Sequence, residues 1–284
     1  MKRITFLLAF IFFAGVAVAQ KSVVFKVKFL PKHTYKMTNN MNMDMHMKVP
    51  DSMAKRANMP PNGMNIKLNG LQIVSIKTGA KTADGSFTYE MKYDSLATKI
   101  SQNGVEKPIP IPAKTGMVIT GVCTPQGKMH VDSIPNAKTD VATQKMILEM
   151  VNKMADRVKF PEKPMTVGES FTQDMPFELP IAGQGSQLNM KCIYKLTGIK
   201  GNEAYFDVAM SMDMSMINNK MPNGSMTLKG TGQGTGTMVY LIDKNFPSQH
   251  ATNFDMHMNM LMANMTMQMD MKATYNIKTE ISAN

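Results

Sequence analysis

Tryptophan is absent from this 284-residue chain, and cysteine occurs only at Cys123 and Cys192. Two cysteines form at most one disulfide, which excludes a small domain held together by a disulfide framework. The sequence leaves open whether the two thiols pair or stay free. Charged residues make up 19% of the chain and stand in ones and twos, not in blocks. That pattern is typical of a solvated surface and gives no reason to expect a nucleic-acid partner.

Long hydrophobic runs are absent beyond the first 20 residues. The chain begins MKRITFLLAFIFFAGVAVAQ, with Lys2 and Arg3 before an apolar run and small residues at Ala17 and Ala19. This is the pattern of a secretory signal peptide, residues 1–19. No later run approaches the ~18 residues of a membrane span, and no cysteine follows the cleavage site for lipid attachment. The sequence therefore predicts a soluble, non-lipidated, periplasmic or secreted bacterial protein, with net charge +11 falling to +9 once Lys2 and Arg3 are removed.

Methionine, in contrast, is abundant, with 33 residues. Many of them alternate with polar residues, as in MTNNMNMDMHMKV (37–49), VAMSMDMSMI (208–217) and FDMHMNMLMANMTMQMDMK (254–272). Successive side chains of a strand point to opposite faces, so a period of two predicts strands with one thioether face and one polar face. In the last stretch the phase changes at Ala263-Asn264, which predicts a two-residue hairpin turn, with a β-bulge as the alternative.

Other strand pairs are indicated by their turns. The predicted pairs are 71–77 with 86–100, 117–124 with 128–134, 190–199 with 204–217, and 237–243 with 249–262. Between them, residues 139–160 carry apolar positions at helical spacing and end at Pro161, which predicts an amphipathic helix. The sequence thus predicts a mainly β fold of two related antiparallel meanders, forming a half-barrel or a sandwich. We place the N-terminal β half at 20–135, the linking helix at 136–159 and the C-terminal β half at 160–284.

Three segments resemble a family of exported, Bacteroidetes-type proteins of unknown function. They are FPEKPMTVGESFTQD (160–174), NMKCIYKLTGIKGNEAYFDVAM (189–210) and GTGTMVYLIDKNFP (234–247). The resemblance extends over most of residues 22–280 and rests on Pro164, Val167, Gly168 and the aromatic Phe171, a position where the family more often has tryptophan. It implies an architecture similar to lipoprotein-carrier half-barrels, in which a curved sheet and a helix enclose an apolar cavity. It implies no catalytic residue.

The methionine face is the candidate site. β-Branched residues suit strands better than methionine, and methionine loses more side-chain entropy when it becomes ordered, so its use here suggests a function. Flexible thioethers repack around varied shapes and recur on promiscuous apolar surfaces. We therefore predict a non-enzymatic protein, without a cofactor, that binds a hydrophobic small molecule or lipid. The predicted lining residues are Met41, Met43, Met45, Met47, Met210, Met212, Met214, Met256, Met258, Met260, Met267 and Met269.

A soft metal is the alternative ligand, because thioethers select Cu(I) and, by the same softness, Ag(I). The motif DMHM occurs at 44–47 and 255–258, so the candidate ligands are Met43, Met45, Met47, Met256, Met258, His46 and His257. Parity places both histidines on the face opposite their neighbouring methionines, where a solvent-facing role is the simpler interpretation. A structural or surface protein without a small ligand is the third interpretation. No histidine pair has metal-binding spacing and no serine lies in a nucleophile elbow.

Overall fold

The computed structural model describes residues 22–50, 54, 60, 63–107, 115–134, 159–181, 184–221, 224–262 and 265–284. Strands account for most of this length. They are β1 (His33–Lys48), β2 (Met64–Thr78), β3 (Phe87–Gln102), β4 (Val105–Lys107), β5 (Val118–Cys123), β6 (Met129–Ser133), β7 (Ser170–Ile181), β8 (Gln184–Lys200), β9 (Glu203–Met221), β10 (Gly224–Leu241), β11 (Phe246–Met262) and β12 (Met265–Ala283). The prediction of a mainly β fold is confirmed.

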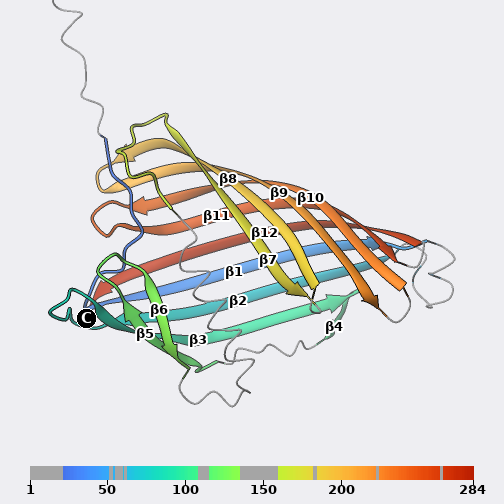
Figure 1. The fold of residues 1–284 in the computed structure, drawn as a ribbon, viewed down its shortest axis with the longest axis horizontal. Helices are drawn as coiled ribbons and strands as arrows, with labels where there is room; N and C mark the ends of the chain where they lie inside the picture. The colour runs from blue at the N-terminus through green and yellow to red at the C-terminus, as the bar shows by residue number, and fades with distance from the viewer. Residues whose placement is uncertain are drawn as a thin grey trace, which may run out of the picture.

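All twelve strands belong to one antiparallel sheet with the order β6-β5-β3-β2-β1-β12-β11-β10-β9-β8-β7, and β4 pairs with β3 (Figure 1). Within each half of the chain, consecutive strands are neighbours in the sheet, except that β5 pairs with β3 and not with β4. The segments β1–β6 and β7–β12 are thus two meanders, and β6 and β7 lie at the two opposite edges of the sheet. The first and last strands join them, with His33 opposite Ala283 and Lys48 opposite Gln268. A single continuous sheet thus unites the N-terminal and C-terminal halves.

The predicted hairpins pair as expected. Strands β2 and β3, β5 and β6, β8 and β9, and β10 and β11 are antiparallel neighbours. The change of methionine phase is a hairpin, because Met262 pairs directly with Met265 and the register continues without a shift along β11 and β12. Both arms consequently keep their methionines on one face of the sheet.

Two predicted segments lie outside the described residues: the signal peptide 1–19, and the linking helix 136–159 except for its last residue, Lys159. Among the described residues, no helix is long and apolar enough to span a membrane.

An aromatic cluster fixes residues 22–30 against one end of the sheet, where Figure 1 shows this segment crossing the strand ends. The Phe25 ring contacts Phe206 at 5.0 Å and Tyr240 at 5.1 Å between centroids, both edge-on. The Tyr240 hydroxyl donates a hydrogen bond to the Lys26 carbonyl oxygen (2.5 Å) and accepts one from the Lys26 amide (3.2 Å). Edge-to-face aromatic pairs and a satisfied phenol both stabilise such a contact. The segment is thus part of the core.

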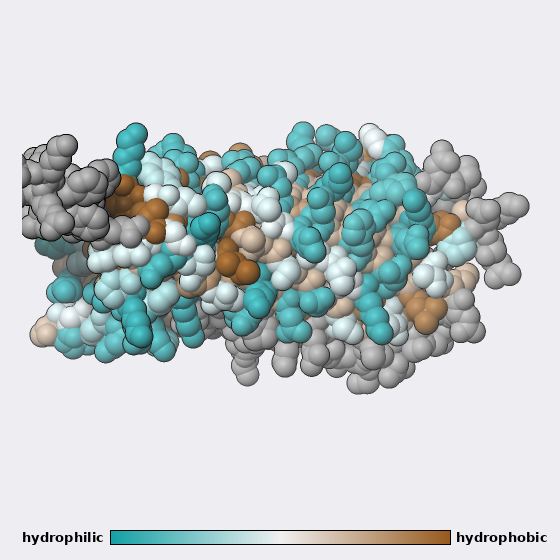
Figure 2. All heavy atoms as spheres, turned by 90° about the horizontal axis from the view of Figure 1, so that it is seen from above, coloured by the Kyte–Doolittle hydropathy of each residue, from teal (hydrophilic) through white to brown (hydrophobic). Residues whose placement is uncertain are grey.

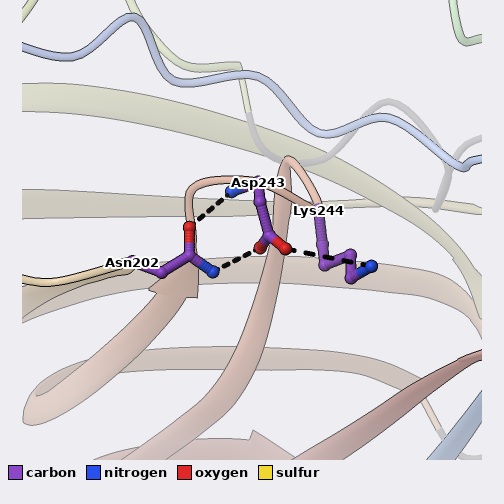
Figure 3. Close-up of polar contacts among 3 residues, drawn as sticks. All are labelled: Asn202, Asp243 and Lys244. Carbon is purple, nitrogen blue, oxygen red and sulfur yellow. Dashed lines mark hydrogen bonds and ion pairs between the residues drawn. The ribbon is translucent and has the colours of Figure 1, made fainter.

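Two hairpin turns contact each other at the same end of the sheet (Figure 3). The Asn202 amide donates to the Asp243 carboxylate, and the Asp243 backbone amide donates back to Asn202 Oδ1 at 3.0 Å. The Lys244 ammonium lies 3.8 Å from the other side of the Asp243 carboxylate. These contacts tie the β8–β9 turn to the β10–β11 turn.

The turn between β2 and β3 contains Asp84, a carboxylate whose pKa is unusually low. Asp84 accepts hydrogen bonds from Thr82 Oγ1 (2.5 Å), from Ser86 Oγ (2.7 Å) and from the Ser86 amide (3.1 Å). These donors favour the charged form and lower the Asp84 pKa from 3.8 to about 2. Because the folded pKa is depressed, the turn is stabilised above about pH 4 and loses that contribution as the pH falls toward 2. An NMR titration should show this, and an Asp84 carboxyl titrating near 3.8 would contradict it.

Both cysteines are free and buried, at opposite ends of the strand order in β5 and β8. Burial raises the pKa of Cys123 to about 11 and also raises that of Cys192. Because the thiolate is the reactive form, we expect neither to react with a thiol reagent such as DTNB in native protein at pH 8. Both should react in guanidinium chloride without a reducing agent. A result of no free thiols under denaturing, non-reducing conditions would instead show a disulfide.

Candidate functional site

The sheet has one polar and one apolar face, as the alternation predicted. In β1, Met41 and Met43 are half-buried while Asn42 and Asp44 are exposed. The aromatic clusters lie on the same face as the methionines, since Tyr35 and Met41 share parity along β1. Figure 2, a view from above, shows a mostly hydrophilic surface with small hydrophobic patches. We call the methionine-bearing side the apolar face.

A methionine cluster occupies the apolar face at the end of the sheet away from the Phe25 contacts. Its buried centre is Met256, Met258 and Met269. Eight half-buried residues from β1, β9, β10, β11 and β12 pack around it, namely Met45, Met47, Met212, Met214, Leu228, Phe254, Met260 and Met271. Register explains this convergence. Met45, Met271 and Met256 lie directly opposite one another on β1, β12 and β11, as do Met47, Met269 and Met258 in the next row.

Glycines on β10 allow the methionines of β9 and β11 to meet. Gly230, Gly232 and Gly234 lie opposite Met258, Met256 and Phe254 of β11 and opposite Met214, Met212 and Met210 of β9. A Cβ at Gly234 would lie 2.7 Å from Phe254 Cδ2 and 2.8 Å from Met210 Cε. Neighbouring side chains therefore already occupy the space above β10. Residues 230–237, GTGQGTGT, thus form a strand segment that carries only glycine on the apolar face.

The predicted lining residues all lie on this face. Met256, Met258, Met267 and Met269 are buried, and Met41, Met43, Met45, Met47, Met210, Met212, Met214 and Met260 are half-buried. Met210 packs mainly against the aromatic cluster, so it marks the boundary between the two zones. The sequence analysis omitted Met216, Phe254 and Met271, although their parity places them on the same face.

Sequence reasoning also missed two polar residues on the apolar face, Asn39 of β1 and His250 of β11. Both lie opposite Ile277 of β12. Burial lowers the pKa of His250, which keeps the imidazole neutral. The available signal was the odd-numbered series Tyr35, Met37, Asn39, Met41, in which one member is polar.

The two histidines of the DMHM motifs lie on the polar face, away from the sulfurs. They flank Asp270, since His46 and His257 are both directly opposite it. His257 Nδ1 is 2.6 Å from Asp270 Oδ1, and His46 Nδ1 is 2.7 Å from Asn65 Oδ1. The contact with His257 lowers the pKa of Asp270. Within the described part of the chain, no three His, Cys, Asp or Glu side chains are placed to share a metal ion.

Two hollows open on the polar side of the sheet. One, of about 460 Å³, lies over β8–β11 and is lined mostly by polar side chains that include Asp213, Lys229 and His257. The other, of about 230 Å³, is lined mostly by residues of the polar face of β1, β10, β11 and β12, such as Asn40 and Gln249, and also by His250 and Ile277. Their mostly polar linings do not suit a hydrophobic ligand.

Comparison with known proteins does not identify a family. No family model and no curated protein matches the chain, so membership of the exported Bacteroidetes-type family stays a prediction. A solved structure on lipid-protein interactions in lipovitellin matches with a TM-score of 0.49 and 12% identity, over 90% of this chain and 26% of that one. The crystal structure of Pseudomonas aeruginosa OccK2 (OpdF) matches with a TM-score of 0.25 and 6% identity, over 89% of this chain and 99% of that one. This chain thus spans about a quarter of the lipovitellin chain, and such scores establish neither a shared fold nor a shared function.

Proposed function

We propose that this is an exported, non-enzymatic protein that binds a hydrophobic, lipid-like ligand on the methionine end of its apolar face. The observation that carries the proposal is the convergence of thioethers from β1, β9, β11 and β12 around the glycines Gly230, Gly232 and Gly234 of β10. Each buried methionine contributes about as much as a leucine, ~1.5–3 kcal/mol, so burial alone does not require methionine. The distinctive property of this surface is its capacity to repack around ligands of different shape.

Paired charge substitutions on one strand test the proposal. Met212 is on the apolar face and Ser211 is on the polar face of β9. We expect Met212→Lys to weaken binding of the fluorescent probe N-phenyl-1-naphthylamine by tenfold or more, because a charge in an apolar site must be desolvated. Ser211→Lys should bind the probe like the unmodified protein. Met212→Leu should also bind the probe. This result would show that the charge of lysine, and not the replacement of Met212 as such, weakens binding.

Native mass spectrometry gives an independent test. Protein isolated from its source organism without detergent should carry adducts with masses of acyl lipids or other apolar molecules. If it carries none, does not bind the probe and instead forms multimers, the structural interpretation replaces the binding interpretation.

A second function, Cu(I) or Ag(I) binding, is favoured by one specific observation. In the rows Met45–Met271–Met256 and Met47–Met269–Met258, three thioethers lie side by side on adjacent strands. Strands are ~4.8 Å apart, so flexible side chains in one row could direct three sulfurs to one soft ion. The histidines His46 and His257 would not contribute from the opposite face.

Replacing Met41, Met43, Met45 and Met47 with leucine separates the two functions. Leucine keeps the apolar area and removes the sulfur, so the variant should retain binding of the fluorescent probe. An anaerobic Cu(I) titration against a chromogenic chelator should show loss of tight binding if β1 supplies ligands. Retained Cu(I) affinity would exclude these four residues as ligands.

A further inference from the structure

Polar side chains cross the apolar face between its aromatic end and its methionine end. Asn39 pairs with Gln72 on β2, and on its other side both Asn39 and His250 lie opposite Ile277. Thr252, buried with 8% exposure, is the next residue of β11 on this face. We call Gln72, Asn39, His250 and Thr252 the polar belt. A buried cluster that contains Tyr35, Tyr89 and Phe246 lies on one side of it along the strands, and the methionine cluster lies on the other.

Two atoms of the polar belt are buried without a partner. Asn39 Oδ1 and His250 Nε2 make no hydrogen bond within the described structure. The Asn39 amide donates to Gln72 Oε1 at 3.1 Å, so only one end of that side chain is satisfied. Because a buried unsatisfied polar atom is costly and rare, such a pair on the apolar face calls for an explanation. One strand, β12, lies between them, so their backbones are two strand spacings, roughly 10 Å, apart.

The residues around the polar belt indicate that a ligand group bound there is uncharged. The two rows that contain it carry no Asp, Glu, Lys or Arg. Their members from β2 to β9 are Gln72, Asn39, Ile277, His250, Met238 and Phe206, then Gly70, Met41, Tyr275, Thr252, Gly236 and Val208. A charged ligand group would be desolvated here without a counter-charge. A hydroxyl both donates and accepts, so it can satisfy a carbonyl oxygen and either tautomer of a neutral imidazole.

We infer that the ligand is a single-tailed amphiphile with a neutral hydroxyl headgroup, held at Asn39 and His250 while its tail lies along the methionine cluster. This inference rests on the proposed function, because it assigns the headgroup end of the same surface. From Asn39 to Met47, β1 advances roughly 26 Å at ~3.3 Å per residue, which accommodates a long extended alkyl chain. Repacking thioethers accept the tail, and the belt fixes its direction.

Competition among probes with one tail and different heads tests the inference. Each compound displaces N-phenyl-1-naphthylamine from the full-length mature protein, below its micellar concentration, at pH 7.5. We expect 1-decanol to displace the dye at about tenfold lower concentration than decyl methyl ether, which cannot donate, as ~1.4 kcal/mol for a satisfied buried group implies. Decanoate and decyltrimethylammonium should be weaker still, since both heads are charged. Monodecanoylglycerol distinguishes a glycerolipid source of the hydroxyl from a simple alcohol.

Substitutions in the polar belt test whether its residues cause the preference for decanol over decyl methyl ether. Asn39→Leu should abolish the advantage of decanol over the ether. Asn40→Leu is the matched control, because Asn40 is the neighbouring residue on the polar face and its change should leave the advantage intact. If Asn39→Leu does not fold, His250→Phe should give the same loss.

The possible outcomes separate the inference from the proposed function. Failure of the unmodified protein to bind the dye or any decyl compound would overturn the proposed function. Dye binding with no preference for decanol, a preference for a charged head, or a preference that survives in both belt variants would overturn the headgroup inference alone.

Discussion

Phe25→Ala is expected to lower the free energy of unfolding by about 3–5 kcal/mol, the usual range for truncating a buried phenylalanine. The Phe25 side chain is 2% exposed and contacts the rings of Phe160, Phe206 and Tyr240. Its loss removes the anchor that holds residues 22–30 on the sheet. Urea denaturation of the mature protein should give the change in stability. Hydrogen exchange should show faster exchange in residues 22–30 than in the central strands.

Val24→Ala is the matched control for this prediction. Val24 precedes Phe25 in the same segment, but its side chain is 38% exposed. We expect a change within about 0.5 kcal/mol, as for most surface substitutions. Similar losses for the two variants would show that the segment is not anchored through Phe25.

Gly234→Ala is expected to destabilise the protein by about 1–2 kcal/mol. Alanine is ordinarily favoured over glycine inside a strand by ~0.5–1 kcal/mol. Here a Cβ would lie 2.6 Å from the Asn253 carbonyl oxygen and within 2.8 Å of side-chain atoms of Phe254 and Met210. Overpacking of this kind costs ~1–3 kcal/mol, so the loss exceeds the gain. Urea denaturation measures the net effect.

Gly198→Ala on β8 provides the comparison, because a Cβ at Gly198 would meet no atom within 4 Å. This variant should be as stable as the unmodified protein or more stable by up to ~0.5–1 kcal/mol. A Gly234→Ala variant as stable as Gly198→Ala would mean that the side chains over β10 are not closely packed. Phe254 and Met210 would then be free to leave space above the strand.

The two predictions concern different parts of one apolar face: its aromatic end, and the place where the methionine cluster borders it. The Phe25 end is packed by aromatic rings whose geometry leaves little freedom, and residues 22–30 cover it. The methionine end is built from flexible side chains that pack over Gly230, Gly232 and Gly234 of β10. Under the proposed function, the aromatic end would maintain the fold while the methionine end adjusts to a ligand.

Some features of this fold were predictable because they are local. Alternation of Met41, Met43, Met45 and Met47 with polar residues fixes which side chains share a face, whatever the strand pairs with. The change of phase at 263–264 and the short polar turns likewise determine hairpins between neighbouring segments. The position of His46 on the face opposite its methionines follows from the same rule.

The sequence by itself determined the strands, the hairpins and the composition of each face, because these depend on spacing within a few residues. Only the tertiary structure decided that β1 pairs with β12, which unites the two meanders. That pairing, between residues more than 200 positions apart, depends on how the whole sheet assembles. It brings the thioethers of β1 beside those of β12 and β11, and it places Asn39 near His250 on the apolar face. Long-range register therefore turned a repeated local pattern into a candidate binding surface.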